Sequence, residues 1–137
     1  MDPLHVLVID DDEVMNFLFG RAISSFALNC KFHCFTTGEA GLAYLGETDR
    51  FPDVILLDYQ LPKMDGFDFL LEYEKRGYHQ AHQILFFMLS SFSRKELAEP
   101  LSTFEFVEGF IEKPLTPIKL QELLVNYFPA IKKKVER

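Results

Sequence analysis

Five short apolar segments alternate along the chain with longer stretches whose apolar residues recur at helical spacing. The expected strands are residues 4–9, 31–35, 54–57, 84–89 and 106–111. The first, third and fourth of these are apolar at nearly every position, instead of alternating with polar residues. Strands of this type are buried on both faces, as in a parallel sheet that helices cover on both sides.

The intervals between the strands carry helix signals. In residues 13–26, Val14, Phe17, Leu18 and Ala22 recur at helical spacing. The later helices are predicted from their ends. The expected end signals are a capping box of Thr36 with Glu39, a cap at Asp65 with a stop at Gly77, a capping box of Ser93 with Glu96 ahead of Pro100, and a cap at Thr116 with Pro117 at the first turn. Five helices are therefore expected.

Five strand–helix units joined by right-handed crossovers predict a doubly wound α/β sandwich, with five helices on the two faces of a parallel sheet. A chain of 137 residues is long enough to bury a core and fits one domain. We expect that domain to span residues 1–128. Residues 129–137 contain Lys132, Lys133, Lys134 and Arg137 and are expected to form a basic, frayed tail.

Charge and hydropathy exclude several classes of function. The net charge of −7 argues against general binding to nucleic acid or anionic membranes. No apolar stretch approaches the roughly 20 residues of a membrane span. The first residues run directly into a strand without a basic leader, so no signal peptide is expected and the cytoplasm is the expected location.

The two cysteines are expected to be reduced packing residues. Cys30 and Cys34 would share one face of a strand at about 13 Å, given roughly 3.3 Å per residue, which is too far for a disulfide. His33 would lie on the opposite face, which disfavours a zinc site with the two thiols.

Charged and hydroxyl side chains follow four of the five expected strands. Asp10 and Asp11 follow the first, Asp58 the third, Ser90 the fourth and Lys113 the fifth. Ligands of open α/β sheets bind beyond the carboxyl ends of the strands. Two carboxylates 4 Å apart repel by about 4 kcal/mol at an effective dielectric of 20, so such a cluster requires a cation. Mg²⁺ prefers these hard oxygen ligands, and it would bring a phosphate next to a carboxylate nucleophile.

Each residue also has an ordinary explanation. Asp11 or Asp12 could cap the first helix, Asp58 and Ser90 could serve local turns, and Lys113 could be a solvated lysine. Their shared position at strand ends favours one common site.

Four motifs together resemble the receiver domain of bacterial response regulators, over about residues 4–128. They are Val8-Ile9-Asp10-Asp11, the run from Leu57-Asp58 through Pro62-Lys63-Met64-Asp65-Gly66, Leu89-Ser90-Ser91, and Glu112-Lys113-Pro114. The resemblance implies a flavodoxin-like sheet of order 2-1-3-4-5. It also implies that residues 1–128 form a receiver domain that catalyses only its own phosphorylation and dephosphorylation and is not otherwise an enzyme.

The resemblance assigns a role to each matching position. Asp58 would accept a phosphoryl group from a sensor histidine kinase or a histidine phosphotransfer protein. Asp11, Asp58 and the backbone carbonyl of Gln60 would ligate Mg²⁺, and Asp10 would hold it through water.

The remaining implied roles concern the phosphoryl group and the response to it. Ser90 and Lys113 would contact phosphoryl oxygens, and the Lys113–Pro114 bond would be cis. Phe110 would swing inward as Ser90 moves, and this would change the face formed by the fourth helix, fifth strand and fifth helix. A downstream protein would bind that face, or the phosphoryl group would pass onward to a histidine phosphotransfer protein.

The sequence argues against three alternative functions. A receiver-fold interaction module could signal without phosphorylation, although the full set of site residues argues against it. A phosphatase of the haloacid dehalogenase type would carry Asp-x-Asp-x-Thr, and Val14 stands where the Thr belongs. A calcium loop starting at Asp10 fails because Met15 occupies the required Gly position and Arg21 that of the bidentate Glu.

Overall fold

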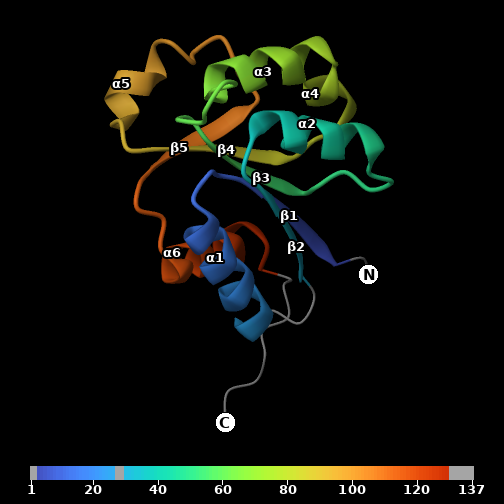
Figure 1. Ribbon diagram of the computed structural model, residues 1–137, viewed down its shortest axis with the longest axis vertical. Coiled ribbons are helices and arrows are strands. Elements are labelled where there is room, and N and C mark those ends of the chain that lie inside the picture. The colour runs from blue at the N-terminus through green and yellow to red at the C-terminus, as the bar shows by residue number, and fades with distance from the viewer. Residues whose placement is uncertain (1–2, 27–29, 130–137) are drawn as a thin grey trace.

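A five-stranded parallel sheet forms the middle layer of the protein (Figure 1). The structure is a computed structural model that describes residues 3–26 and 30–129. The strands are β1 Leu4–Ile9, β2 Cys30–Phe35, β3 Val54–Asp58, β4 Leu85–Ser90 and β5 Val107–Glu112. Their order is β2-β1-β3-β4-β5, and each neighbouring pair is parallel. The predicted sheet order is confirmed, with strand ends shifted by one residue at β2, β3, β4 and β5.

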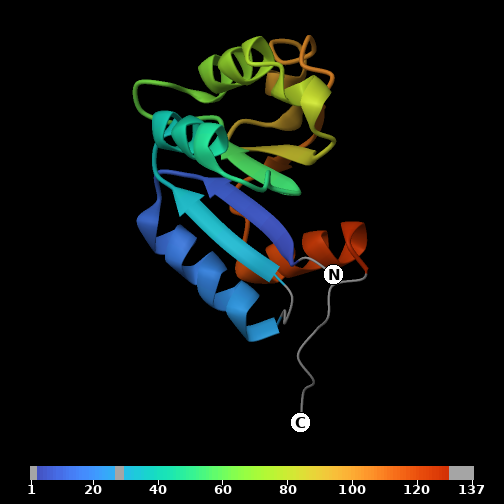
Figure 2. The same ribbon diagram turned by 90° about the vertical axis from the view of Figure 1, so that its right-hand side faces the viewer.

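Helices cover both faces of the sheet. They are α1 Glu13–Phe26, α2 Gly38–Glu47, α3 Gly66–Lys75, α4 Tyr78–Ala81, α5 Arg94–Ala98 and α6 Pro117–Tyr127. Figures 1 and 2 show α1 and α6 on one face and α2, α3, α4 and α5 on the other. The prediction of five helices is wrong by one, because α4 is a single turn that is too short to show periodicity. The predicted fourth and fifth helices therefore correspond to α5 and α6.

The central strands are buried on both faces, as their sequences predicted. The side chains of 6–9 in β1 and 54–57 in β3 are at most 1% exposed. Alternate residues enter two separate apolar clusters because successive strand side chains point to opposite faces. Leu7 and Ile55 pack with Phe69 on the α2–α3 side, whereas Val6 and Leu56 pack with residues of α1 and α6.

The helix caps follow the sequence with one correction. Asp65 and Ser93 each form a capping box, and Thr116 Oγ1 accepts a hydrogen bond from Lys119 N at 3.2 Å. The capping box predicted for Thr36 is wrong, because Thr37 is the N-cap and accepts from Ala40 N at 3.1 Å. Thr36 and Thr37 have the same side chain and could each cap the helix. The N-cap is Thr37 because α2 begins at Gly38.

Helix α1 is present, but the residues that predicted it do not face the core. Val14, Phe17 and Leu18 are 69%, 62% and 41% exposed, whereas Phe19 and Ile23 are each 2% exposed. Both sides of this helix carry apolar residues, and periodicity alone does not choose between them.

Both cysteines are free thiols, as expected. Cys30 is half-buried, and burial raises the pKa of its thiol to about 11. Cys34 is exposed, so its interpretation as a packing residue is wrong. The predicted basic tail lies outside the described residues from residue 130 onward, and no helix that the structure describes is long and apolar enough to cross a membrane.

Gly66, at the first position of α3, allows the β3–α3 connection to pass close to β4. A Cβ placed there would lie 2.8 Å from Tyr59 Cα and 2.7 Å from Met88 Cε. Since a backbone atom cannot move aside as a side chain does, Gly66→Ala is expected to lower the free energy of unfolding by about 1–3 kcal/mol in urea denaturation.

Gly46→Ala is the matched control, because its Cβ would meet only Tyr78 Oη at 3.8 Å. In the last turn of α2 this substitution should stabilise the protein by up to about 1 kcal/mol. Equal effects of the two substitutions would contradict the close approach at Gly66.

Candidate functional site

Three buried polar side chains meet at the carboxyl edge of the sheet. Asp10 directly follows β1, Asp58 ends β3 and Ser90 ends β4. These residues are 2%, 1% and 2% exposed. The three strands are neighbours in the sheet, so the predicted residues come together because parallel strands end at the same edge.

Lys113 reaches this cluster from the end of β5. Its Nζ lies 2.9 Å from Asp58 Oδ2 and 3.2 Å from Asp10 Oδ2. Its backbone N–H donates to the carbonyl of Ser90 at 2.8 Å, which holds the backbone of Lys113 against the end of β4. The Lys113–Pro114 bond is cis, as the resemblance implied.

Backbone donors hold the two buried carboxylates in place. Gln60 N donates to Asp58 Oδ1 at 3.1 Å, and Asp12 N donates to Asp10 Oδ1 at 3.0 Å. Each acid therefore directs one oxygen to the backbone and the other to Lys113. Asp12 Oδ1 also accepts a hydrogen bond from Met15 N at 3.1 Å. This aspartate therefore caps α1, as the sequence allowed.

Asn16 supports the site, although no motif in the sequence marks it. This residue is 3% exposed, and its Nδ2 donates to the backbone carbonyl of Asp10 at 2.8 Å. A polar residue one turn into an amphipathic helix was the available signal, but only the fold shows that this position turns back toward β1.

The carboxylates of Asp10, Asp11 and Asp58 can provide oxygen ligands to a metal ion. One oxygen of each residue lies within 4.8 Å of the others. Asp11 is exposed, while the other two are buried. A set of hard oxygen donors that is open on one side fits a divalent cation that keeps several waters, which is the preference of Mg²⁺.

The electrostatics of the cluster are dominated by burial. Burial raises the pKa of Asp58 to about 6, and the charge of Asp10 adds to this, while hydrogen bonds from Lys113 and the Gln60 backbone oppose it. Burial alone would lower the pKa of Lys113, but its hydrogen bond with Asp58 and the charges of Asp10 and Asp58 raise it. Lys113 therefore stays charged, and a bound cation would return Asp58 to the ionised form.

The mouth of the site is formed by the loop after β4. Phe92 N donates to Ser90 Oγ at 2.9 Å, and Ser91 Oγ donates to Gln60 Oε1. The Phe92 ring is 40% exposed and lies edge-on to Tyr59 at 6.1 Å between centroids.

Phe110 is half-buried on β5, opposite Met88 of β4.

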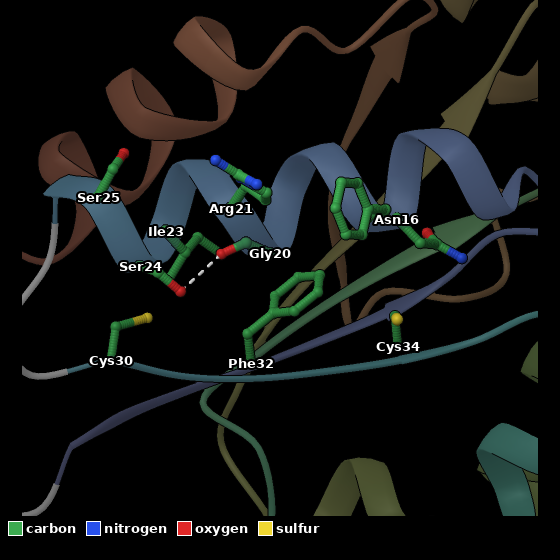
Figure 3. Close-up of a pocket in the computed structure, with 10 residues that line it drawn as sticks. Asn16, Gly20, Arg21, Ile23, Ser24, Ser25, Cys30, Phe32 and Cys34 are labelled. Carbon is green, nitrogen blue, oxygen red and sulfur yellow. Dashed lines mark hydrogen bonds between the residues drawn. The ribbon is translucent and has the colours of Figure 1, made fainter.

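A separate open groove of about 760 Å³ lies between α1 and β2 (Figure 3). Cys30, Phe32 and Cys34 project toward α1 from β2, and Arg21 and Ser24 line the helix side. None of the acidic or lysine site residues lines this groove.

The chain matches the response regulator receiver domain family over residues 6–125. It belongs to this family, whose members are the phosphoacceptor domains of two-component signalling systems.

Curated relatives share modest identity with the chain. The probable methanogenesis regulatory protein FilR2 of Methanothrix harundinacea is 27% identical over 119 residues, which cover 84% of this chain and 75% of the relative. The sensor histidine kinase CheAY of Helicobacter pylori is 34% identical over 70 residues, which cover 51% of this chain and 8% of the kinase. The chain thus spans most of one relative and a small part of the other.

Solved structures share the fold. The Mn²⁺-bound response regulator Rcp1 matches with a TM-score of 0.77 and 18% identity, covering 97% of this chain and all of that one. The chemotaxis response regulator CheY4 of Vibrio cholerae matches with a TM-score of 0.75 and 22% identity, covering 90% and 98%.

The raised pKa of Asp58 predicts how the stability of the metal-free protein depends on pH. The folded state holds a proton on Asp58 up to about pH 6, whereas the usual carboxyl value is 3.8. Stability should therefore fall as pH rises through this window, because the folded state binds more protons than the unfolded state.

Asp58→Asn removes this titration. In urea denaturation with a chelator, the variant should gain about 1–3 kcal/mol over the wild type between acidic and neutral pH. Identical pH profiles of the two proteins would show that Asp58 ionises normally in the folded state.

Proposed function

We propose that Asp58 accepts a phosphoryl group from a phosphohistidine of a sensor histidine kinase or a histidine phosphotransfer protein. The carrying observation is the position of its carboxylate, which is buried at the end of β3 between Lys113 Nζ and the backbone N–H of Gln60. An oxygen of Asp58 forms the new bond to phosphorus as the phosphorus–nitrogen bond of the donor breaks. The histidine nitrogen leaves with the bonding electron pair, and the product on Asp58 is an acyl phosphate.

Asp11, Asp58 and the backbone carbonyl of Gln60 would hold Mg²⁺, and Asp10 would hold it through water. When bound, this ion neutralises charge on the phosphoryl oxygens during transfer. Lys113 supplies a second positive charge, because its Nζ already touches the acceptor carboxylate. Asp10 keeps that ammonium oriented by its own contact at 3.2 Å.

Ser90 and Phe110 are proposed to transmit the modification. The Ser90 hydroxyl lies at the end of β4, beside the acceptor strand, and can turn from Phe92 N to a phosphoryl oxygen. Phe110 would then move inward on β5 and alter the face formed by α5, β5 and α6. This is a shift between two packings that the phosphoryl contacts bias, and a downstream protein would bind the altered face.

The phosphodonor protein is proposed to dock on apolar side chains that surround the site. Val14 and Phe17 lie in the first turns of α1, which begins directly after the acidic cluster, and Ile118 lies in the first turn of α6, shortly after Lys113. They are 69%, 62% and 67% exposed. Exposed apolar side chains can mark protein interfaces, and these three lie in the first turns of helices that begin shortly after Asp10 and Lys113.

Phosphorylation with acetyl phosphate and Mg²⁺ tests the acceptor. Wild type should gain one phosphoryl group by intact mass, and Asp58→Asn should gain none. Asp12→Asn is the matched control, since Asn can keep the α1 cap and Asp12 is exposed, and it should behave as the wild type.

Equal incorporation by wild type and Asp58→Asn would place the acceptor on another residue. A wild type that gains no phosphate at any Mg²⁺ concentration would favour the alternative of a phosphorylation-independent interaction module.

Phe17→Ser tests the docking surface. Transfer from a purified histidine kinase that phosphorylates the wild type should slow by about tenfold or more, because a buried aromatic anchor is lost from the interface. The rate with acetyl phosphate should stay unchanged. Leu71→Ser, which alters an exposed leucine on α3, should leave both rates unchanged. Slowing with both donors would instead mean that Phe17 supports the site itself.

A further inference from the structure

A second cluster of potential metal ligands lies at the amino half of the sheet. It consists of His5 on β1, His33 on β2 and Tyr44 on α2. His5 is 2% exposed, while His33 and Tyr44 are half-buried and reach the surface. His5 stands five residues before Asp10, or about 16 Å along the strand at roughly 3.3 Å per residue. The cluster is therefore distinct from the acidic site.

Three ligand atoms of this cluster point at one another. His5 Nε2 lies 3.1 Å from His33 Nδ1 and 2.9 Å from the Tyr44 hydroxyl, which lies 3.4 Å from His33 Nδ1. Ligands about 2.0–2.1 Å from a tetrahedral zinc ion are roughly 3.3 Å apart. The triangle of side-chain atoms thus has nearly the size of one face of such a coordination shell, and water can complete the shell from the solvent side.

Hydrogen bonding alone leaves this cluster incompletely satisfied. Two neutral imidazoles that face each other share a single hydrogen between their inner nitrogens. The outer nitrogen of His5, Nδ1, is buried and has no partner among the described residues. This ring interrupts the apolar run of β1, where an aliphatic side chain would pack without that cost.

The surroundings keep the two rings neutral. Burial lowers the pKa of His5, and the nearby His33, Arg50 and Lys31 lower it further. Burial likewise lowers the pKa of His33. Neutral rings offer the lone pairs that a metal requires. The same positive charges, partly offset by the Asp53 carboxylate that pairs with Arg50, oppose a cation and limit its affinity.

We propose that His5, His33 and Tyr44 form a binding site for one divalent transition-metal ion of the Zn²⁺ class. His5 Nε2, His33 Nδ1 and the Tyr44 hydroxyl are the protein ligands. Imidazole nitrogen suits zinc, copper and nickel, whereas Mg²⁺ prefers oxygen. On binding, the hydrogen between the two rings moves from His33 Nδ1 to the outer Nε2 of the same half-buried ring, and His5 keeps its hydrogen on Nδ1, so both imidazoles stay neutral. The ion links the edge strand β2 to β1 and α2.

Isothermal titration with Zn²⁺ in saturating Mg²⁺ tests the site, since the excess Mg²⁺ competes for the carboxylates. Wild type should bind one Zn²⁺, and its melting temperature should rise on binding. His33→Gln should weaken binding by about tenfold or more, since it removes a direct ligand. Tyr44→Phe should weaken binding without unfolding α2, because the ring remains.

Three control variants separate this site from other donors. Cys34→Ser removes the exposed thiol, His82→Gln removes a histidine of another part of the surface, and Asp58→Asn disrupts the acidic cluster. All three should bind Zn²⁺ as the wild type does. Wild-type affinity in His33→Gln, loss of binding in any control, or no wild-type binding at micromolar Zn²⁺ would overturn the proposal.

A measurement on the histidine rings of the wild type tests the site even if a variant folds poorly. Nitrogen-15 NMR of the histidine rings in the wild type should show Zn²⁺-induced shifts at His5 and His33 and none at His79. Shifts confined to other histidines would equally refute the site.

Discussion

Lys113 holds together a cluster that would otherwise repel itself. Asp10 and Asp58 are almost completely buried, and each directs one carboxylate oxygen at the same ammonium. Two like charges 4 Å apart at an effective dielectric of 20 repel by about 4 kcal/mol, and each buried ion costs several kcal/mol of lost hydration. β5 lies two strands from β3, roughly 10 Å at about 4.8 Å per strand, so the length of a lysine side chain is needed to span it. The sheet order thus sets the distance over which Lys113 must reach the two carboxylates.

This charge balance explains how one modification could affect a distant surface. Three aspartates and one lysine sum to −2, which a divalent cation neutralises. The proposed phosphoryl group on Asp58 would add negative charge again, which Lys113 would offset by its charge and Ser90 would contact by a hydrogen bond. Lys113 directly follows β5 and its backbone is bonded to Ser90, so a rearrangement of either residue acts on the strand that carries Phe110. Lys113 therefore links Asp58, which its ammonium contacts, to β5, which is part of the proposed output face.

The sequence predicts those features that repeat or that topology enforces. Central strands that are buried on both faces produce continuous apolar runs, and parallel strands bring Asp10, Asp58, Ser90 and Lys113 to one edge without any further information. Features decided by tertiary contact were not predicted. The core-facing side of α1 depends on where α6 and β2 lie, so Phe17 could not be distinguished from Phe19. The contacts of Asn16 with the Asp10 carbonyl and of Tyr44 with His5 exist only in the folded chain, and α4 has too few residues to show a period.

The two ends of β1 carry ligands of opposite character, and this difference allows them to select different ions. The acidic end has a net charge of −2 and attracts any dication mainly by charge, so the more abundant Mg²⁺ can occupy it. The histidine end is neutral with Lys31 and Arg50 nearby, so charge alone does not favour a cation there. Only an ion that gains from nitrogen coordination overcomes that field, and this follows the Irving–Williams preference for later transition metals. The positive surroundings weaken the binding of either dication at the histidine end, and the selectivity against Mg²⁺ comes from the nitrogen donors.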